Sequence, residues 1–216
     1  MIKNVCPLCL TEDNVLLYKA DKRSDFREFY NCRNCDLVYV GENFHLNKQQ
    51  EKKRYKSHNN DPYDAGYRNF LNRLFSQLKP YLNKEMEGLD YGAGPGPCLS
   101  IMMKEEGYKV DIYDPFFHPN KEVLKNRYDF ITSTETVEHF YKPRQEFNKF
   151  QNLLKSGGFL AIMTSMLDDW SKFSNWHYHI DPTHVVFYSK ETFKWIAREY
   201  DWDVTFPKKN IIIFKK

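Results

Sequence analysis

A short glycine-rich segment carries the first residues whose types and spacing could do chemistry. Leu89 to Cys98 read LDYGAGPGPC, with glycines at Gly92, Gly94 and Gly96. Glycines at alternate positions let a backbone turn tightly and approach a ligand closely. The segment therefore predicts a ligand-binding loop, and the identity of its ligand decides the chemistry.

The spacing of this loop argues against a dinucleotide. The phosphate-binding fingerprint of dinucleotide folds is G-x-G-x-x-G, and Pro97 stands where its third glycine belongs. Asp90, just before the loop, would repel a pyrophosphate, whereas a carboxylate beside an ammonium group is favourable. The loop therefore favours a zwitterionic, cationic ligand without phosphate, such as S-adenosylmethionine.

A second acid lies where a nucleoside would need one. Asp114 ends the segment KVDIYD, 18 residues beyond Gly96, and its carboxylate could accept hydrogen bonds from both ribose hydroxyls. Asp111 is a rival, although it lies in the middle of the predicted strand. A helix-capping turn with acids placed by chance would explain the loop alone. The loop and Asp114 together favour a nucleoside site.

Two cysteine pairs near the N-terminus have metal-ligand spacing. The pattern C-x2-C, 22 residues, C-x2-C is close to that of zinc ribbons, and its members are Cys6, Cys9, Cys32 and Cys35. Four thiolates close a tetrahedral site, so we expect structural Zn²⁺ with no open position for catalysis. Disulfides are disfavoured in the reducing cytoplasm that we expect for this chain.

The fifth cysteine, Cys98, follows the glycine loop at the start of a predicted helix. A helix N-terminus can make a thiol more acidic, which would suit a nucleophile. A small buried residue packed near the ligand is the simpler interpretation.

Four of the seven histidines gather in two segments that should share one edge of the fold. The segment NWHYHIDPTHVVFYS holds His177, His179 and His184, and His139 follows an earlier predicted strand. Three interpretations compete. His139 with His179 or His184 could supply a general base; the three later histidines and Asp181 could bind a divalent metal; or the turn is structural. The clustering predicts that at least one histidine faces a substrate.

The elements that would position these residues alternate along the chain. A strand and turn are predicted at 87–94, strands at 109–116, 128–135 and 159–165, and a final strand pair at 203–206 and 210–215, separated by Pro207. Helices are predicted at 64–82 (ended by Pro80), at 98–108, at 143–158 with a glycine stop, and at 189–202 from the capping Ser189. Alternating strands and helices imply an α/β fold, with a mostly parallel sheet covered by helices on both faces.

Composition bounds the function classes. The net charge of +3 over 216 residues is too mild to argue for nucleic acid, although a local basic patch could exist. The N-terminus does not resemble a signal peptide, and no stretch reaches the roughly 18 apolar residues that span a bilayer. We expect a soluble, cytoplasmic protein with no membrane partner.

These motifs together resemble a known family. LDYGAGPG followed by VDIYD resembles motif I and the second-strand acid of class I S-adenosylmethionine-dependent methyltransferases. YDFITSTETVEHF and LLKSGGFLAIMTS are similar to their fourth strand, following helix and fifth strand. The E-x-x-E-H sequence from Glu135 to His139 resembles the polyprenyl-quinone O-methyltransferases. The resemblance covers roughly residues 64–216 and specifies the cofactor, not the acceptor.

The resemblance implies a Rossmann-like sheet and a set of residues around S-adenosylmethionine: Asp90, Gly92, Gly94, Gly96, Asp114, Thr134 and Glu135. The glycines would lie under its methionine part, the first acid would face its ammonium group and the second its ribose. The last two residues would flank the methionine end.

One departure from the family concerns the adenine. Asp129 follows Asp114 by only 15 positions, in a stretch where the family usually fits a helix, a third strand and an adenine-contacting loop. We therefore expect a missing or reduced third strand, with Phe116 or Phe117 stacking on the adenine.

The predicted organisation is a zinc ribbon over 1–42, a linker over 43–63 and a methyltransferase domain over 64–216. A methyl acceptor on oxygen or carbon of a small molecule is favoured, because STET stands where amino-directed enzymes carry Asn-Pro-Pro-Tyr. Alternatively, the ribbon and the basic linker NKQQEKKRYK could bind an RNA or protein acceptor. Zinc units precede both sugar-nucleotide and ribosomal-RNA methyltransferases, so the ribbon does not identify the substrate. A scaffold without activity is disfavoured by the intact loop and acids.

Overall fold

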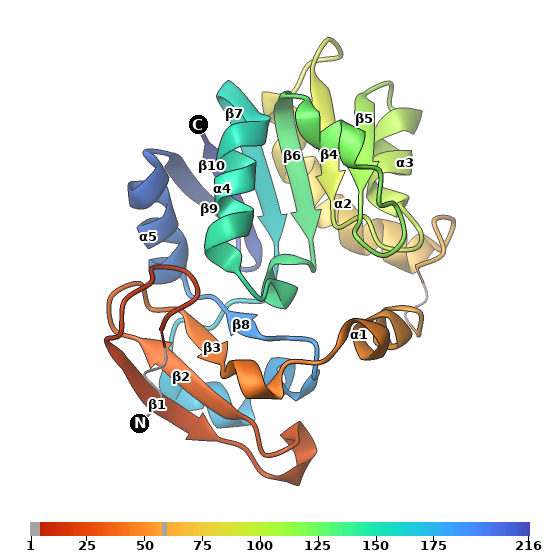
Figure 1. Cartoon of the computed structure of the whole chain (residues 1–216). Coiled ribbons are helices and arrows are strands. Elements are labelled where there is room, and N and C mark those ends of the chain that lie inside the picture. Colours follow the sequence, from red (N-terminus) through yellow and green to blue (C-terminus); the bar gives the residue numbers. More distant parts are fainter. Residues whose placement is uncertain (1–4, 58–59) are drawn as a thin grey trace.

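Two sheets organise the chain in the computed structural model, which describes residues 5–57 and 60–216 (Figure 1). The larger sheet has the order β5-β4-β6-β7-β10-β9. Its strands are β4 (Glu87–Tyr91), β5 (Lys109–Tyr113), β6 (Tyr128–Thr134), β7 (Leu154–Met163), β9 (Asp203–Lys208) and β10 (Ile211–Lys215). Residues 1–4 of the predicted ribbon and 58–59 of the predicted linker lie outside the described residues.

The register of this sheet fits the predicted α/β class. β4 pairs in parallel with β5 and β6, β6 pairs in parallel with β7, and the terminal hairpin β9–β10 pairs antiparallel to β7 through β10. Among the described residues no strand lies beyond β5, and a short 3-10 helix at Lys121–Lys125 follows it. The expected reduction of the third strand is therefore confirmed.

Helices cover both faces of the sheet. They are α2 (Ala65–Leu78) and α3 (Cys98–Glu105) on one face, and α4 (Pro143–Leu153) and α5 (Lys190–Tyr200) on the other (Figure 1). Side chains of α2 and α3 pack with Val110 and Phe130, whereas those of α4 and α5 pack with Ile131 and Phe214. The alternating faces of each strand thus feed two separate hydrophobic layers.

Local capping explains where two of these helices begin. The Asp64 side chain accepts a hydrogen bond from the Tyr67 amide at 2.6 Å, and Ser189 forms a reciprocal capping box with Thr192. Caps of this kind contribute about 1 kcal/mol each. Both helices begin directly after their caps, as the sequence predicts, and a 3-10 turn containing Pro80 follows α2.

The smaller sheet combines an early and a late segment of the chain. Its antiparallel order is β1-β2-β3-β8, formed by β1 (Asn14–Lys19), β2 (Glu28–Cys32), β3 (Val38–Val40) and β8 (Val186–Phe187). β8 comes from the segment between β7 and α5, so the cysteine-containing sheet is completed by the later part of the chain. This sheet lies beyond the ends of β6 and β7 toward which their arrowheads point (Figure 1).

Helix α1 (Lys48–Tyr55) connects the two sheets and begins with a capping box formed by Asn47 and Gln50. Among the helices formed by the described residues, none is both long enough and apolar enough to cross a bilayer.

Candidate functional site

A cavity of about 1280 Å³ opens at the carboxyl ends of the parallel strands. The loops after β4, β5 and β6 line it, and α1 lines the opposite wall. In α/β folds with parallel strands, ligands bind at this edge of the sheet. The cavity is therefore the candidate site.

The glycine loop after β4 forms part of the cavity wall. Gly92 has φ +83° and its amide donates to the Tyr113 carbonyl at 2.8 Å; a Cβ there would lie 2.3 Å from Thr136. Gly94 also has a positive φ, of +65°. Gly96 does not line the cavity; a Cβ on it would lie 1.9 Å from the Asn60 carbonyl oxygen. The first two glycines thus permit the turn, and the third permits close packing behind it.

Asp114 ties the glycine loop to the end of β5. Its Oδ1 accepts from the amides of Phe116 and Phe117 at 2.8 and 3.0 Å, and its Oδ2 accepts from the Gly94 amide at 3.0 Å. A carboxylate offers about four lone pairs. This carboxylate therefore keeps about one acceptor position for a ribose hydroxyl, and its first task is to shape the loop.

Asp90 lies at the end of β4 and also lines the cavity. Its side chain is almost fully buried, and Oδ1 accepts a hydrogen bond from the Thr132 hydroxyl at 2.8 Å. Burial raises the pKa of Asp90 to about 6. A cationic ligand beside it would favour the charged form.

Aromatic residues border the region next to Asp114. Phe116 and Phe117 line the cavity, and the Phe116 ring lies 5.5 Å from the ring of Tyr55 on α1. This places both predicted adenine-stacking residues at the cavity. Whether either contacts adenine stays a prediction.

One buried and one partly buried carboxylate face the same tyrosine beyond the end of β6. The Tyr178 hydroxyl lies 2.5 Å from Glu138 Oε1 and 3.3 Å from Glu135 Oε2. Glu138 is fully buried and also accepts from the Thr164 hydroxyl at 3.0 Å. Burial, together with the charge of Glu138, raises the pKa of Glu135 to about 8.

Glu135 also has an unusual backbone. Its φ is +47°, in the left-handed region that side chains other than glycine rarely adopt. Such conformations cost of order 1–3 kcal/mol and concentrate at functional sites. Glu135 and the neighbouring Thr134 both line the cavity; that they flank the methionine end of the cofactor stays a prediction.

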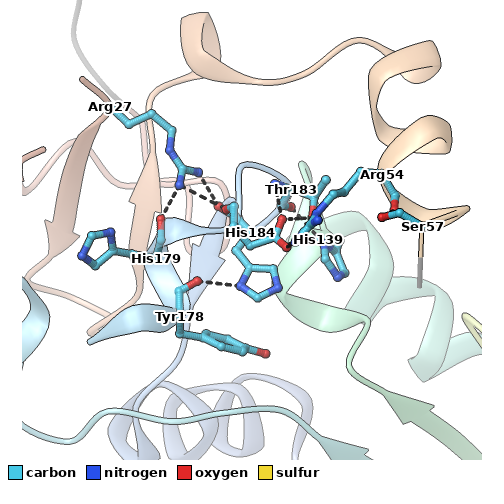
Figure 2. Close-up of polar contacts among 9 residues, drawn as sticks. Arg27, Arg54, Ser57, His139, Tyr178, His179, Thr183 and His184 are labelled. Carbon is cyan, nitrogen blue, oxygen red and sulfur yellow. Dashed lines mark hydrogen bonds and ion pairs between the residues drawn. The ribbon is translucent and has the colours of Figure 1, made fainter. Parts of the chain in front are cut away.

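His139 and His184 lie against each other at the cavity, although they come from distant segments (Figure 2). Their ring centroids are 4.9 Å apart. His139 Nδ1 lies 2.9 Å from the Thr183 carbonyl oxygen, and His184 Nδ1 lies 2.7 Å from that of Tyr178. A carbonyl only accepts, so each Nδ1 donates, and each neutral ring keeps its lone pair on Nε2.

The electrostatic environment keeps His184 neutral. Burial and the neighbouring His139 lower its pKa to about 4. At pH 7 its Nε2 is therefore a base or a ligand atom, not a proton donor.

His179 occupies a different place. Its ring packs against Phe29 and Phe173, with Nδ1 at 3.0 Å from the Ser24 hydroxyl and Nε2 at 3.4 Å from the Ser174 carbonyl oxygen. It does not line the cavity, and His177 is exposed. The structure thus brings together only two of the three histidines predicted as bases.

Arg27, which directly precedes β2 of the smaller sheet, holds residues 177–184, called here the histidine loop. The sequence did not predict this role. Its buried guanidinium donates to the carbonyl oxygens of His179, Asp181 and His184 (Figure 2). The pairing is between segments about 155 residues apart, so no local pattern could reveal it. Arg27 therefore positions the loop that carries His184.

Asp181, considered above as a metal ligand, serves the same loop. Its Oδ2 accepts from Nε and Nη2 of Arg54 in α1 at 3.1 and 2.6 Å, and its Oδ1 accepts from the Thr183 amide at 2.9 Å. Although burial opposes it, the hydrogen bonds from Arg54 and Thr183 lower the pKa of Asp181. Asp181 thus fastens α1 to the histidine loop.

The four paired cysteines come together beside the smaller sheet, where Cys32 ends β2 and the other three lie outside its strands. The Sγ atoms of Cys6 and Cys35 are 3.6 Å apart, those of Cys9 and Cys32 are 3.3 Å apart, and all four lie within 4.8 Å of one another. Zn–S bonds of about 2.3 Å place neighbouring sulfurs about 3.8 Å apart. The cluster is therefore compatible with a tetrahedral metal site.

Cys98 begins α3 and lines the cavity. Burial raises the pKa of its thiol, which opposes the thiolate that a nucleophile needs. The packing interpretation therefore fits this residue better.

Comparison with protein families gives one match: a family model described as a methyltransferase domain matches residues 63–205. No curated protein sequence is significantly similar to the chain.

Several solved structures share the fold at low identity. A SAM-dependent methyltransferase from Archaeoglobus fulgidus is 19% identical with a TM-score of 0.52, covering 78% of this chain and 99% of that one. Magnesium protoporphyrin IX methyltransferase from Synechocystis, with bound SAH, is 12% identical with a TM-score of 0.52, covering 80% and 89%.

An O-methyltransferase family protein from Burkholderia thailandensis is 12% identical with a TM-score of 0.49 over 76% of this chain, which spans 61% of that protein's length.

Proposed function

This chain belongs to the family of S-adenosylmethionine-dependent methyltransferases, and we propose that it moves the methyl group to an oxygen or carbon atom of a small molecule with assistance from His139 and His184. The observation that carries this proposal is the composition of this cavity: a loop and two acids suited to the donor adjoin two histidines with open Nε2 atoms.

The donor end of the cavity fits S-adenosylmethionine. The positive φ of Gly92 and Gly94 lets the backbone approach the methionine part, and Asp90 offers a carboxylate to its ammonium group. Asp114 keeps an acceptor position for the ribose. The bound donor supplies an electrophilic methyl group on a sulfonium, so placing the acceptor correctly provides most of the acceleration.

The acceptor end suits a small aromatic or apolar molecule that carries a hydroxyl. Tyr55, Phe140 and Tyr141 line it, and α1 covers it. As the oxygen–methyl bond forms and the methyl–sulfur bond breaks, the hydroxyl proton leaves toward a histidine Nε2, and S-adenosylhomocysteine is the second product. The likeness of E-x-x-E-H to the polyprenyl-quinone O-methyltransferases supports an oxygen acceptor.

The cysteine cluster completes the proposal. Cys6, Cys9, Cys32 and Cys35 would hold structural Zn²⁺ in a ribbon, because four thiolates leave no open position on the ion. None of the five cysteines, all of which lie within the described residues, forms a disulfide, which suits a reducing compartment, so we place the protein in the cytoplasm.

A macromolecular acceptor is the second candidate. Lys48 and Lys52 of α1 line the cavity, and Lys53 is exposed beside them. Such lysines could contact the phosphates of an RNA. RNA affinity that falls steeply with salt would favour this candidate, because phosphate contacts release counterions; no RNA binding at low salt would exclude it.

Transfer of a tritiated methyl group from S-adenosylmethionine into a fractionated cell extract tests the two candidates. The proposal expects label in the small-molecule fraction, lost in His139→Ala and His184→Ala and retained in the exposed control His177→Ala. Label only in RNA or protein would contradict a small-molecule acceptor, and full turnover in both cavity variants would contradict histidine assistance.

A further inference from the structure

Three side chains with metal-ligating atoms converge at the acceptor end of the cavity. One ligand atom from each of Glu138, His139 and His184 can be chosen so that all lie within 4.8 Å of one another. A divalent ion with bonds of about 2.1 Å separates its ligand atoms by about 3 to 4.2 Å. Small side-chain movements would therefore bring the three atoms onto one ion.

The histidines are held as metal-binding histidines are. Each donates Nδ1–H to a backbone carbonyl, His139 to Thr183 and His184 to Tyr178. Metal-ligating histidines almost always donate their second ring nitrogen in this way, which fixes the ring and leaves the other nitrogen for the ion. The pattern occurs twice here, on two segments 45 positions apart in sequence.

The third ligand has the same kind of support. Glu138 is fully buried, and hydroxyls of Tyr178 and Thr164 bond its two oxygens. Each carboxylate oxygen accepts more than one interaction, so these bonds orient Glu138 without saturating it.

The carboxylates around Tyr178 also favour a bound cation. The single phenolic proton of Tyr178 lies between Glu138 and Glu135 and cannot serve both carboxylates. Within residues 5–57 and 60–216, neither carboxylate forms an ion pair with lysine or arginine. A carboxylate buried among neutral donors is costly, and the donors to Glu138, the hydroxyls of Tyr178 and Thr164, carry no charge. A divalent ion would offset that cost.

We propose that Glu138, His139 and His184 hold a divalent metal ion whose remaining positions open into the acceptor end of the cavity. Two imidazoles and a carboxylate suit a first-row ion such as Mn²⁺, Fe²⁺ or Zn²⁺. This site is separate from the four cysteines. It deepens the proposed function and in that part rests on it: with their Nε2 atoms on the ion, His139 and His184 would assist by holding a Lewis acid that makes the acceptor hydroxyl more acidic, and the proton would pass to solvent in place of a histidine.

Manganese titration followed by electron paramagnetic resonance tests the site without donor or acceptor. Thiolates discriminate against Mn²⁺, so zinc-loaded full-length chain leaves only the proposed site for it. We expect the wild-type chain to bind one Mn²⁺. If the purified chain already holds two zinc ions, the second zinc occupies the proposed site and should be absent from variants of Glu138, His139 and His184. His184→Ala, His139→Ala and Glu138→Gln should each weaken Mn²⁺ binding at least tenfold.

The matched control is His177→Ala, which removes an exposed histidine of the same segment and should bind Mn²⁺ normally. Circular dichroism verifies folding, and three separate ligand variants protect against the failure of one. Absence of both Mn²⁺ binding and a second zinc in the wild-type chain, or equal affinity in folded ligand variants, would overturn the metal site.

The role of the ion is measured separately from its binding. Methyl transfer that persists undiminished after the site is emptied would overturn the acceptor-binding role and leave the proposed function intact. Mn²⁺ binding in a chain that transfers no methyl group to any fraction would keep the metal site and overturn the proposed function.

Discussion

Asp114→Asn separates the two tasks of this carboxylate. The asparagine oxygen can still accept hydrogen bonds from the amides of Phe116 and Phe117. Its NH₂ group, however, faces the Gly94 amide, from which Oδ2 of Asp114 accepts a hydrogen bond at 3.0 Å in the wild-type chain. Losing one charge-assisted bond and leaving a donor facing a donor costs about 2–4 kcal/mol of the free energy of unfolding. Losing a ribose hydroxyl bond to a charged acceptor costs about 1.5–3 kcal/mol, or roughly 10- to 150-fold in affinity.

Urea unfolding measures the first effect, and calorimetry with S-adenosylhomocysteine measures the second. Asp111→Asn is the matched control on the same strand: Asp111 accepts from the Tyr128 hydroxyl at 2.8 Å and does not line the large cavity. It should leave the affinity unchanged. A folded Asp114→Asn variant that binds within twofold of wild type would refute the ribose role.

Three further substitutions test other parts of the account. Gly92→Ala should lower the free energy of unfolding in urea by about 2–4 kcal/mol, because its backbone is left-handed and the new Cβ overlaps the Thr136 side chain. Gly157→Ala is the control: its φ is also positive, but no atom lies within 4 Å of the new Cβ, so it should cost only about 1–2 kcal/mol. Equal costs for the two variants would contradict this reasoning. Cys32→Ser should lower the zinc content by one ion per chain, while Cys98→Ser should not; unchanged zinc in Cys32→Ser would exclude the cluster as the site. Burial raises the pKa of Asp90 from 3.8 to about 6, so the folded state retains this proton more tightly and the free energy of unfolding falls as pH rises from about 4 to 6. Asp90→Asn should remove that decrease, of order 3 kcal/mol, in unfolding curves without donor; an identical pH dependence in both proteins would count against it.

Local patterns in the sequence predicted the core of the fold well. The positions of β4, β5 and β6 and of the glycine loop depend on short-range periodicity and turn residues, and these elements were found where expected. The same holds for the helix starts at Asp64 and Ser189, because a cap acts within three residues.

One helix end was predicted wrongly. The glycine stop at 157–158 led to a helix extending to that point, whereas α4 ends at Leu153 and β7 begins at Leu154. Gly157 instead has φ +76° within the strand. Tertiary pairing of β7 with β6 outweighed the local signal.

Long-range pairing explains what the sequence could not reveal in the site. β8 joins the smaller sheet, and Arg27 holds the histidine loop across the chain. As a result, His179 packs in an aromatic cluster, whereas His184 packs against His139. Histidine spacing alone could not separate the two outcomes, because the flanking residues of both are similarly polar and aromatic.

The most direct test of the central claim is calorimetric titration of the wild-type chain with S-adenosylhomocysteine and, separately, with NAD. The account predicts one S-adenosylhomocysteine site per chain and no NAD binding, because the loop provides a carboxylate and no third spaced glycine for a pyrophosphate. Binding of NAD in place of S-adenosylhomocysteine, or binding of neither, would contradict it.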